Sequence, residues 1–216
     1  MTLEDQPQTT PARISIMARL VPALSYALPA LGAAVSAMLL LNVLRAMRNA
    51  EAAGIAAVAG GISEANIAIL VTLYLAIFIG GAGIVIGLVR LFTTTTTASP
   101  SALYYLIAGV LGMAPMFALW KAQSLLLDAI IPRSVGAGVS EVAGQITLFS
   151  IVAIVLGGVS IIILLASSFV KLPAILRAKR KWAPLVALLV IETAIIAMTV
   201  VYHLRTTWLY SGFRDY

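Results

Sequence analysis

The sequence contains no cysteine, one histidine and few charged residues. Without cysteine there is no disulfide framework and no thiolate chemistry. A single histidine excludes a histidine-rich metal cluster, and no Ser-His-Asp or paired-carboxylate pattern occurs at helical spacing. We therefore expect no enzymatic activity, no catalytic residue, no metal site and no cofactor.

Charge is too scarce for a soluble domain. Charged residues make up 10% of the 216 residues and hydrophobic residues 62%, with a mean hydropathy of +1.06, whereas a soluble domain has about 25% charged residues. The chain cannot cover itself with polar side chains, so it is predicted to be an integral membrane protein. Its apolar runs are long and do not alternate, which indicates helices rather than barrel strands.

The apolar runs predict five membrane spans, at 21–44, 65–89, 103–119, 142–170 and 183–204. The expected organisation in chain order is an N-terminal cytoplasmic tail (1–20), a first helical hairpin (21–92), a Thr-rich linker (93–101), a second helical hairpin (102–170), a basic cytoplasmic loop (171–182), and a fifth transmembrane helix with an outer tail (183–216).

An internal repeat relates the two hairpins. Shifting the sequence by 77 positions aligns 61–92 with 138–169, and 12 of these 32 positions are identical. The identities include the Gly-x-Ser-Glu motif that opens each segment and a Gly-Gly pair within it. Because each copy holds two spans, both copies cross the membrane in the same direction. The predicted fold is all-α, with a parallel, duplicated two-helix hairpin plus a C-terminal helix.

The basic residues flank the spans and form no single patch, which does not favour nucleic-acid binding. With the N-terminus inside, eight basic residues lie inside and six outside. The positive-inside rule then predicts a cytoplasmic N-terminus and an external C-terminus. The cluster that decides this orientation, and that could also contact anionic lipid headgroups, is Lys171, Arg177, Lys179, Arg180 and Lys181.

Three carboxylates are candidates for a proton path. Glu192 lies ten residues after the interfacial Trp182, which corresponds to about 15 Å along a helix and therefore to the middle of the bilayer. It is either a proton site or a neutral acid that bonds to a neighbouring helix or a partner subunit. Glu64 and Glu141 recur in both repeats; either they belong to the path, or they interact with the positive ends of helix dipoles.

Glycines within the predicted spans indicate close helix packing. Small residues let helix backbones approach, and no strand precedes these glycines as a phosphate-binding loop would require. The predicted packing positions are Gly80, Gly81, Gly83, Gly87, Gly157 and Gly158.

Each repeat resembles the proton-channel subunits of the MotA/TolQ/ExbB family, in which a Gly-rich span leaves the membrane and a Gly-Ile-x-Glu-Ala-Leu motif opens the returning span. The segments that carry the resemblance are 32–35 with 61–66, and 109–113 with 138–143. The resemblance implies a bacterial inner membrane, Glu64 and Glu141 as the retained acids, and an oligomer around partner helices. The chain lacks the family's large cytoplasmic domain and pore threonines; Thr72 and Thr147 are the nearest candidates for the threonines of the returning spans.

The leading functional hypothesis is a non-enzymatic subunit of an inner-membrane complex, related to ion-driven energy-transducing channels and in contact with lipids and other subunits as a homo- or hetero-oligomer. The alternative is a structural accessory or assembly subunit of a respiratory, photosynthetic or secretion complex. A small-molecule transporter is the third hypothesis. It would need a polar cavity at mid-membrane, where Glu192 and Thr193 are the polar residues that the sequence indicates.

Overall fold

The computed structural model describes residues 16–49, 55–93, 99–130, 139–178 and 180–212. Within them, the elements in chain order are α1 (Ile16–Asn49), α2 (Ile55–Thr93), α3 (Ala102–Ile130), α4 (Val139–Phe169), the short 3-10 helix η1 (Ala174–Leu176) and α5 (Trp182–Gly212). All five α-helices are long and apolar enough to cross a membrane. The predicted all-α membrane fold with five spans is therefore confirmed.

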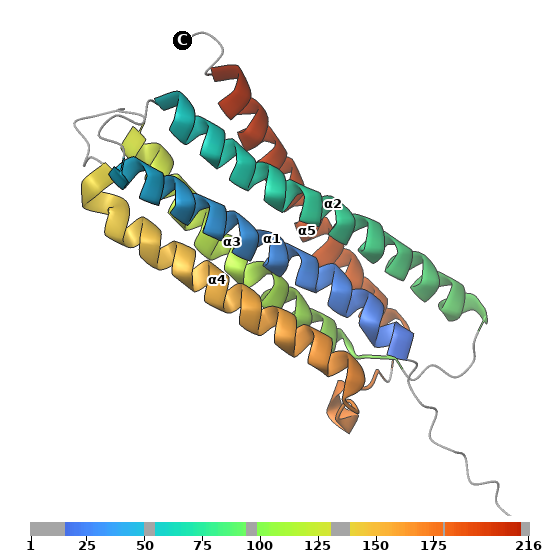
Figure 1. The fold of residues 1–216 in the computed structure, drawn as a ribbon. Coiled ribbons are helices and arrows are strands. Elements are labelled where there is room, and N and C mark those ends of the chain that lie inside the picture. Colours follow the sequence, from blue (N-terminus) through green and yellow to red (C-terminus); the bar gives the residue numbers. More distant parts are fainter. Residues whose placement is uncertain (1–15, 50–54, 94–98, 131–138, 179, 213–216) are drawn as a thin grey trace, which may run out of the picture.

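The two hairpins run in the same direction through the bundle (Figure 1). Helices α1 and α3 start at one end of the bundle, and α2 and α4 return to it. Helix α5 then runs parallel to α1 and α3, so the chain alternates up and down throughout. We call the end at which α1 starts the basic end, because it carries the cluster after α4, and the other the opposite end.

The helices extend beyond the apolar runs that predicted them. Helix α1 begins at Ile16, so residues 16–20 are helical rather than part of the tail, and α5 continues to Gly212. Hydropathy marks only the part of a helix inside the hydrocarbon, while backbone hydrogen bonding continues the helix into the headgroup region. The central residues of the Thr-rich linker, 94–98, lie outside the described residues.

The start of α2 differs most from the prediction. The Ser63-Glu64 pair was expected to open the second span, but α2 begins at Ile55. The intervening segment is rich in alanine, the best helix former, and it continues the helix. Glu64 therefore lies beyond the first turn of α2, whereas Glu141 is in the first turn of α4. Helix-dipole stabilisation thus applies to Glu141 and not to Glu64.

Helix α1 is the centre of the bundle and packs against α2, α3 and α4. Of its most apolar 18-residue window, 56% is buried, against 28% for α2 and for α4. Small side chains cover this helix, namely the buried Ala23, Ala27, Ala30, Ala33, Ala34 and Ala37. Glycines of its neighbours meet its backbone: Gly112 of α3 lies against the carbonyl of Tyr26, and Gly157 of α4 against that of Ala30.

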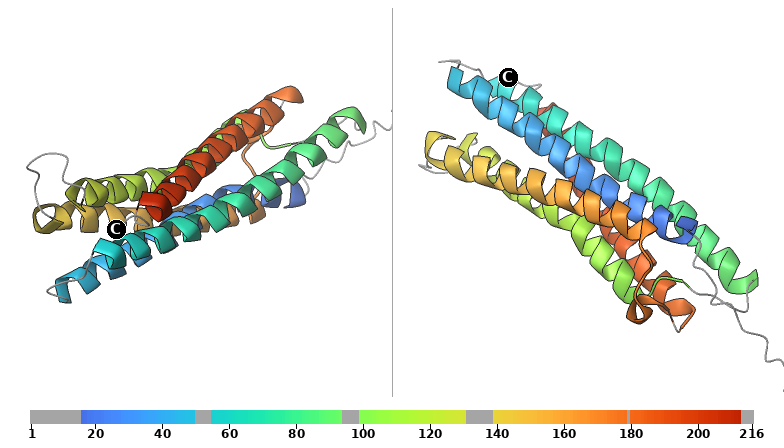
Figure 2. Two further views of the ribbon diagram at one scale, coloured as in Figure 1. Left: turned by 90° about the horizontal axis from the view of Figure 1, so that it is seen from above. Right: turned by 60° about the horizontal axis from the view of Figure 1, so that its bottom comes forward.

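Four of the helices form a closed arrangement, which we call the four-helix ring. Helix α1 packs against α2, α2 against α5, α5 against α3, and α3 against α1. Helix α5 lies between α2 and α3 (Figure 2). Helix α4 is outside this ring and packs against α1 and α3. The interior that the ring encloses is therefore formed by both hairpins and the C-terminal helix.

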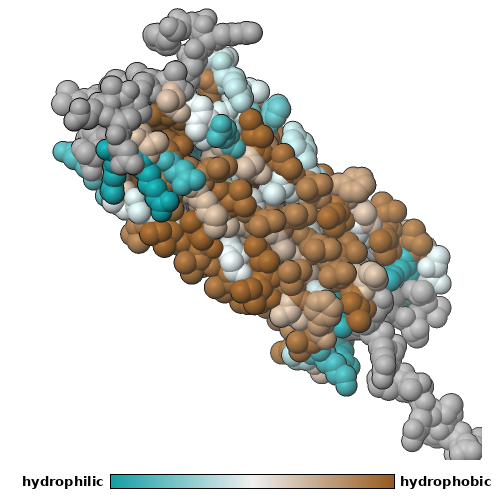
Figure 3. Space-filling model, in the orientation of Figure 1, coloured by the Kyte–Doolittle hydropathy of each residue, from teal (hydrophilic) through white to brown (hydrophobic). Residues whose placement is uncertain are grey.

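The face of the molecule shown in Figure 3 carries a broad apolar belt between two hydrophilic ends. Large apolar side chains of the helices are strongly exposed, including Phe78 of α2 at 77% and Ile162 of α4 at 68%. In water such a surface would be highly unfavourable, but lipid chains cover it without cost. The belt supports contact between these helices and membrane lipid.

The packing predicts opposite effects of alanine at neighbouring glycines. In Gly157→Ala the added Cβ would lie 2.8 Å from the carbonyl oxygen of Ala30, whereas no described residue lies within 4 Å of a Cβ added at Gly158. We expect Gly157→Ala to destabilise the protein by about 1–3 kcal/mol through overpacking. Gly158→Ala should be neutral or stabilising, because alanine has the higher helix propensity. Unfolding by denaturing detergent in micelles measures both variants, and equal stability would contradict the packing.

Candidate functional site

Glu192 is buried inside the four-helix ring. Its side chain is 4% exposed, and it contacts two other helices. The Ser25 hydroxyl of α1 is 2.9 Å from Glu192 Oε1. A Cβ added at Gly80 of α2 would overlap the carboxyl group. The absence of a side chain at Gly80 thus provides the space for the acid, and Glu192 links α5 to α1 and α2.

The hydrogen bonds at Ser25 favour a protonated Glu192. The Ser25 hydroxyl is also 3.0 Å from the carbonyl oxygen of Ala76. A hydroxyl carries one proton, so an ionised carboxylate and the carbonyl would compete for it. If Glu192 is protonated, the acid donates to Ser25, and Ser25 donates to Ala76. A buried charge in hydrocarbon is also costly, so both arguments point to the neutral acid.

Further polar groups lie at or next to Ser25 on α1. Pro29 has no N–H, so it cannot donate the helical hydrogen bond to the carbonyl of Ser25. The side chain of Tyr26 is 1% exposed, and its hydroxyl has no hydrogen-bond partner among the described residues. Helix α1 therefore carries a carbonyl without its usual helical donor and a buried hydroxyl at Ser25 and Tyr26, where it contacts Glu192.

The other two predicted acids are not brought to this site. Glu64 and Glu141 are exposed. Glu64 lies 16 residues before Gly80 on α2, which is about 24 Å along the helix. The structure thus separates the buried acid of the C-terminal helix from the two acids of the repeat.

The predicted packing glycines have different surroundings. Besides Gly80 and Gly157, Gly83 faces Val21 of α1, and Gly87 faces Leu185 of α5. A Cβ added at Gly81 or Gly158 would meet nothing within 4 Å. Among the described residues, only one member of each Gly-Gly pair therefore approaches another helix.

Thr72 and Thr147, the threonines nearest to the positions expected for the pore threonines, use their hydroxyls within their own helices. Thr72 donates to the carbonyl of Ile69 at 2.8 Å, and Thr147 donates to that of Ala143 at 2.7 Å. Thr72 also lies against Gly32 of α1. Their positions are thus fixed by local hydrogen bonds and by helix packing.

The basic cluster lies where the chain passes from α4 to α5. Lys171, Arg177, Arg180 and Lys181 are exposed, and Lys179 lies outside the described residues. This segment pairs with the end of the Thr-rich linker, since the Ala178 N–H donates to the Ser99 carbonyl at 2.8 Å. The charges therefore lie on a segment that is held against the basic end of the bundle.

Among the described residues, no group of three or more His, Cys, Asp or Glu side chains could hold a metal ion. Comparison with models of protein families, with curated proteins and with solved structures finds no match to this chain. Membership of the MotA/TolQ/ExbB family remains a prediction from the repeat.

Sequence reasoning identified Glu192 but missed Ser25, Ala76 and Tyr26 around it. Serine and alanine are common in membrane helices, so neither Ser25 nor Ala76 stands out singly. The signal that could have found α1 as their carrier is its regular spacing of small residues between 23 and 37, typical of a helix with close neighbours on several sides.

The site predicts that Glu192 is protonated at neutral pH. The infrared spectrum of the protein in detergent should contain a carboxylic-acid C=O absorption that disappears in Glu192→Gln, because the amide cannot produce it. The matched control is Glu64→Gln, in which an exposed carboxylate is replaced and the band should remain. A wild-type spectrum without that band at neutral pH would show that Glu192 is ionised.

Proposed function

We propose that this chain is a non-enzymatic, multi-pass subunit of a bacterial inner-membrane complex, of the type of the ion-driven MotA/TolQ/ExbB channels, and that Glu192 binds the transported proton. The observation that carries the proposal is the buried contact of Glu192 with Ser25 inside the four-helix ring. An acid at this depth is costly for a membrane protein and is most often found on ion pathways.

The proposal assigns the proton path to the interior of one chain. The space beside Gly80 is filled by Glu192 of the same chain, and the space beside Gly157 is filled by α1 of the same chain. These glycine faces are therefore not available to copies arranged around an axis. Glu64 and Glu141, the acids implied by the family resemblance, would then act at the surface or in contact with partner subunits.

A structural accessory subunit is the second candidate. The same Glu192–Ser25 bond supports it, because a neutral acid that joins three helices needs no transport role. The two candidates differ in one respect: a proton carrier requires the acid, whereas a structural bond accepts an amide in its place.

Proton flux separates the two candidates. In liposomes with an internal pH-sensitive dye and an imposed membrane potential, the wild-type chain should acidify the lumen faster than protein-free liposomes do. Glu192→Gln should abolish this flux, because an amide cannot release a proton. The double variant Glu64→Gln/Glu141→Gln is the control and should retain it. A wild-type flux equal to that of empty liposomes would favour the accessory subunit.

The proposed orientation has the basic end in the cytoplasm and the C-terminus outside. Because the chain has no cysteine, single cysteines report on this directly. In intact cells whose outer membrane has been permeabilised, a membrane-impermeant maleimide should label Ser211→Cys. Arg177→Cys should be labelled only after lysis. The reverse pattern would invert the topology.

A further inference from the structure

A second set of buried polar side chains lies inside the four-helix ring, and each helix contributes one. We call it the amide layer: Ser36 of α1, Asn66 of α2, Gln123 of α3 and Tyr202 of α5. None of the four is more than 1% exposed. Both side-chain atoms of Asn66 and of Gln123, and the Tyr202 hydroxyl, have no hydrogen-bond partner among the described residues.

Contacts between the helices show where these residues lie along the bundle axis, a position that we call their depth. On the α1–α2 side, the Ser36 hydroxyl donates to the carbonyl of Ala65 at 2.7 Å, so the adjacent Asn66 lies at the depth of Ser36. On the α1–α3 side, Gly112 meets the carbonyl of Tyr26. Ser36 is ten residues beyond Tyr26, and Gln123 is eleven beyond Gly112, so these two also share one depth.

Helix α5 brings Tyr202 to the same depth. Arg205 Nη2 donates to the Ser124 hydroxyl at 3.4 Å, which aligns α5 with α3. Tyr202 precedes Arg205 by three residues, and Gln123 precedes Ser124 by one, so the two differ in depth by about 3 Å. The four side chains thus form one level of the ring rather than four scattered positions.

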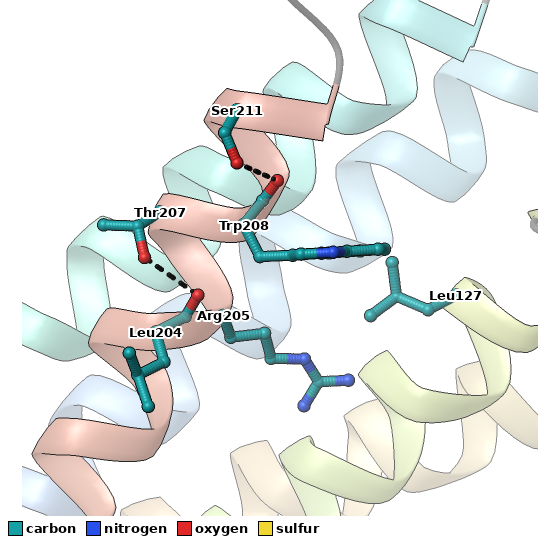
Figure 4. A pocket seen from close by; sticks show the side chains of 6 residues that line it. All are labelled: Leu127, Leu204, Arg205, Thr207, Trp208 and Ser211. Atoms are coloured by element: carbon teal, nitrogen blue, oxygen red, sulfur yellow. Dashed lines mark hydrogen bonds between the residues drawn. The ribbon is translucent and has the colours of Figure 1, made fainter.

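The amide layer lies nearer the opposite end than Glu192 does. Tyr202 is six residues before Trp208, about 9 Å along α5 from that interfacial side chain. Beside it, Arg205 and Trp208 of α5 face Leu127 of α3 across a hollow of about 720 Å³ (Figure 4). Toward Glu192, each ring helix contributes a fully buried apolar side chain, namely Ala33, Leu73, Met116 and Ile195.

We infer that the amide layer binds ordered water. Its members are uncharged and combine donors with acceptors, so the fitting ligand is neutral, donates as well as accepts, and is small. Unpaired amides in a membrane interior are strongly unfavourable, and a buried water typically supplies about three hydrogen bonds to such groups. The layer is then a hydrated compartment. It ends at the buried apolar side chains Ala33, Leu73, Met116 and Ile195, which lie between the layer and Glu192. It exists whether or not Glu192 carries protons.

Cysteine labelling of the full chain tests this hydration. The probe is a small, charged methanethiosulfonate reagent, which modifies thiolates. Asn66→Cys and Gln123→Cys should react at least about tenfold faster than Leu73→Cys and Leu119→Cys, because an apolar surrounding suppresses the thiolate. Leu73 lies seven residues after Asn66, and Leu119 lies four residues before Gln123, so each control is on the same helix face as its partner. Both controls are fully buried as well. Equal rates in the members of each pair would overturn the inference.

A stability measurement covers the case in which a cysteine variant does not fold. If the layer is dry, its amides only cost stability, and Asn66→Leu and Gln123→Leu should raise the midpoint of unfolding by denaturing detergent. If water satisfies these amides, leucine brings no such gain, and the midpoint should stay equal or fall. A rise in both variants overturns the inference. The readout is independent of proton flux.

Discussion

Close approach of helix backbones along α1 is the constraint on which the bundle depends. Inside a bilayer, burying apolar side chains brings little gain, because lipid chains are equally apolar. Stability must come from dispersion contacts and interhelical hydrogen bonds, and both act only at short range. The alanines of α1, with Gly112 and Gly157 facing its carbonyls, bring three neighbours into that range. The bond from Ser25 to Ala76 and that from Ser36 to Ala65 become possible only at this spacing.

The same constraint explains how a duplicated hairpin gave rise to an asymmetric bundle. Gly80 and Gly157 are equivalent in the repeat, yet Gly157 meets α1 and Gly80 meets Glu192 of α5. Helix α5 therefore packs against the Gly80 face of α2, as α1 packs against the Gly157 face of α4. The C-terminal helix completes the packing of the first hairpin and closes the ring, and this gives its acid an interior position that neither repeat provides.

Much of this arrangement could be predicted from the sequence, because hydropathy and the repeat act through simple rules. Span number and hairpin direction follow from the length of the apolar runs and from the 77-residue offset. The start of α2 could not be predicted, since the helix-forming alanines before Glu64 look like a loop of small residues. The partners of Glu192 could not be predicted either, because α5 has no counterpart in the repeat and Gly80 looks the same as Gly81. Which glycine of a pair approaches another helix is decided by tertiary packing.

The order of polar and apolar levels sets a requirement on any proton that uses Glu192. Ala33, Leu73, Met116 and Ile195, all fully buried, separate the acid from the amide layer, and a proton cannot cross a dry apolar level without a chain of hydrogen bonds. Transport would therefore need α5 to shift against α1 and α2, so that Glu192 leaves Ser25. Gly80 suits such a shift, because it presents no side chain to the moving carboxyl. A larger residue at this position would overlap the carboxyl group, so the buried acid requires the glycine in a structural subunit as well as in a proton carrier.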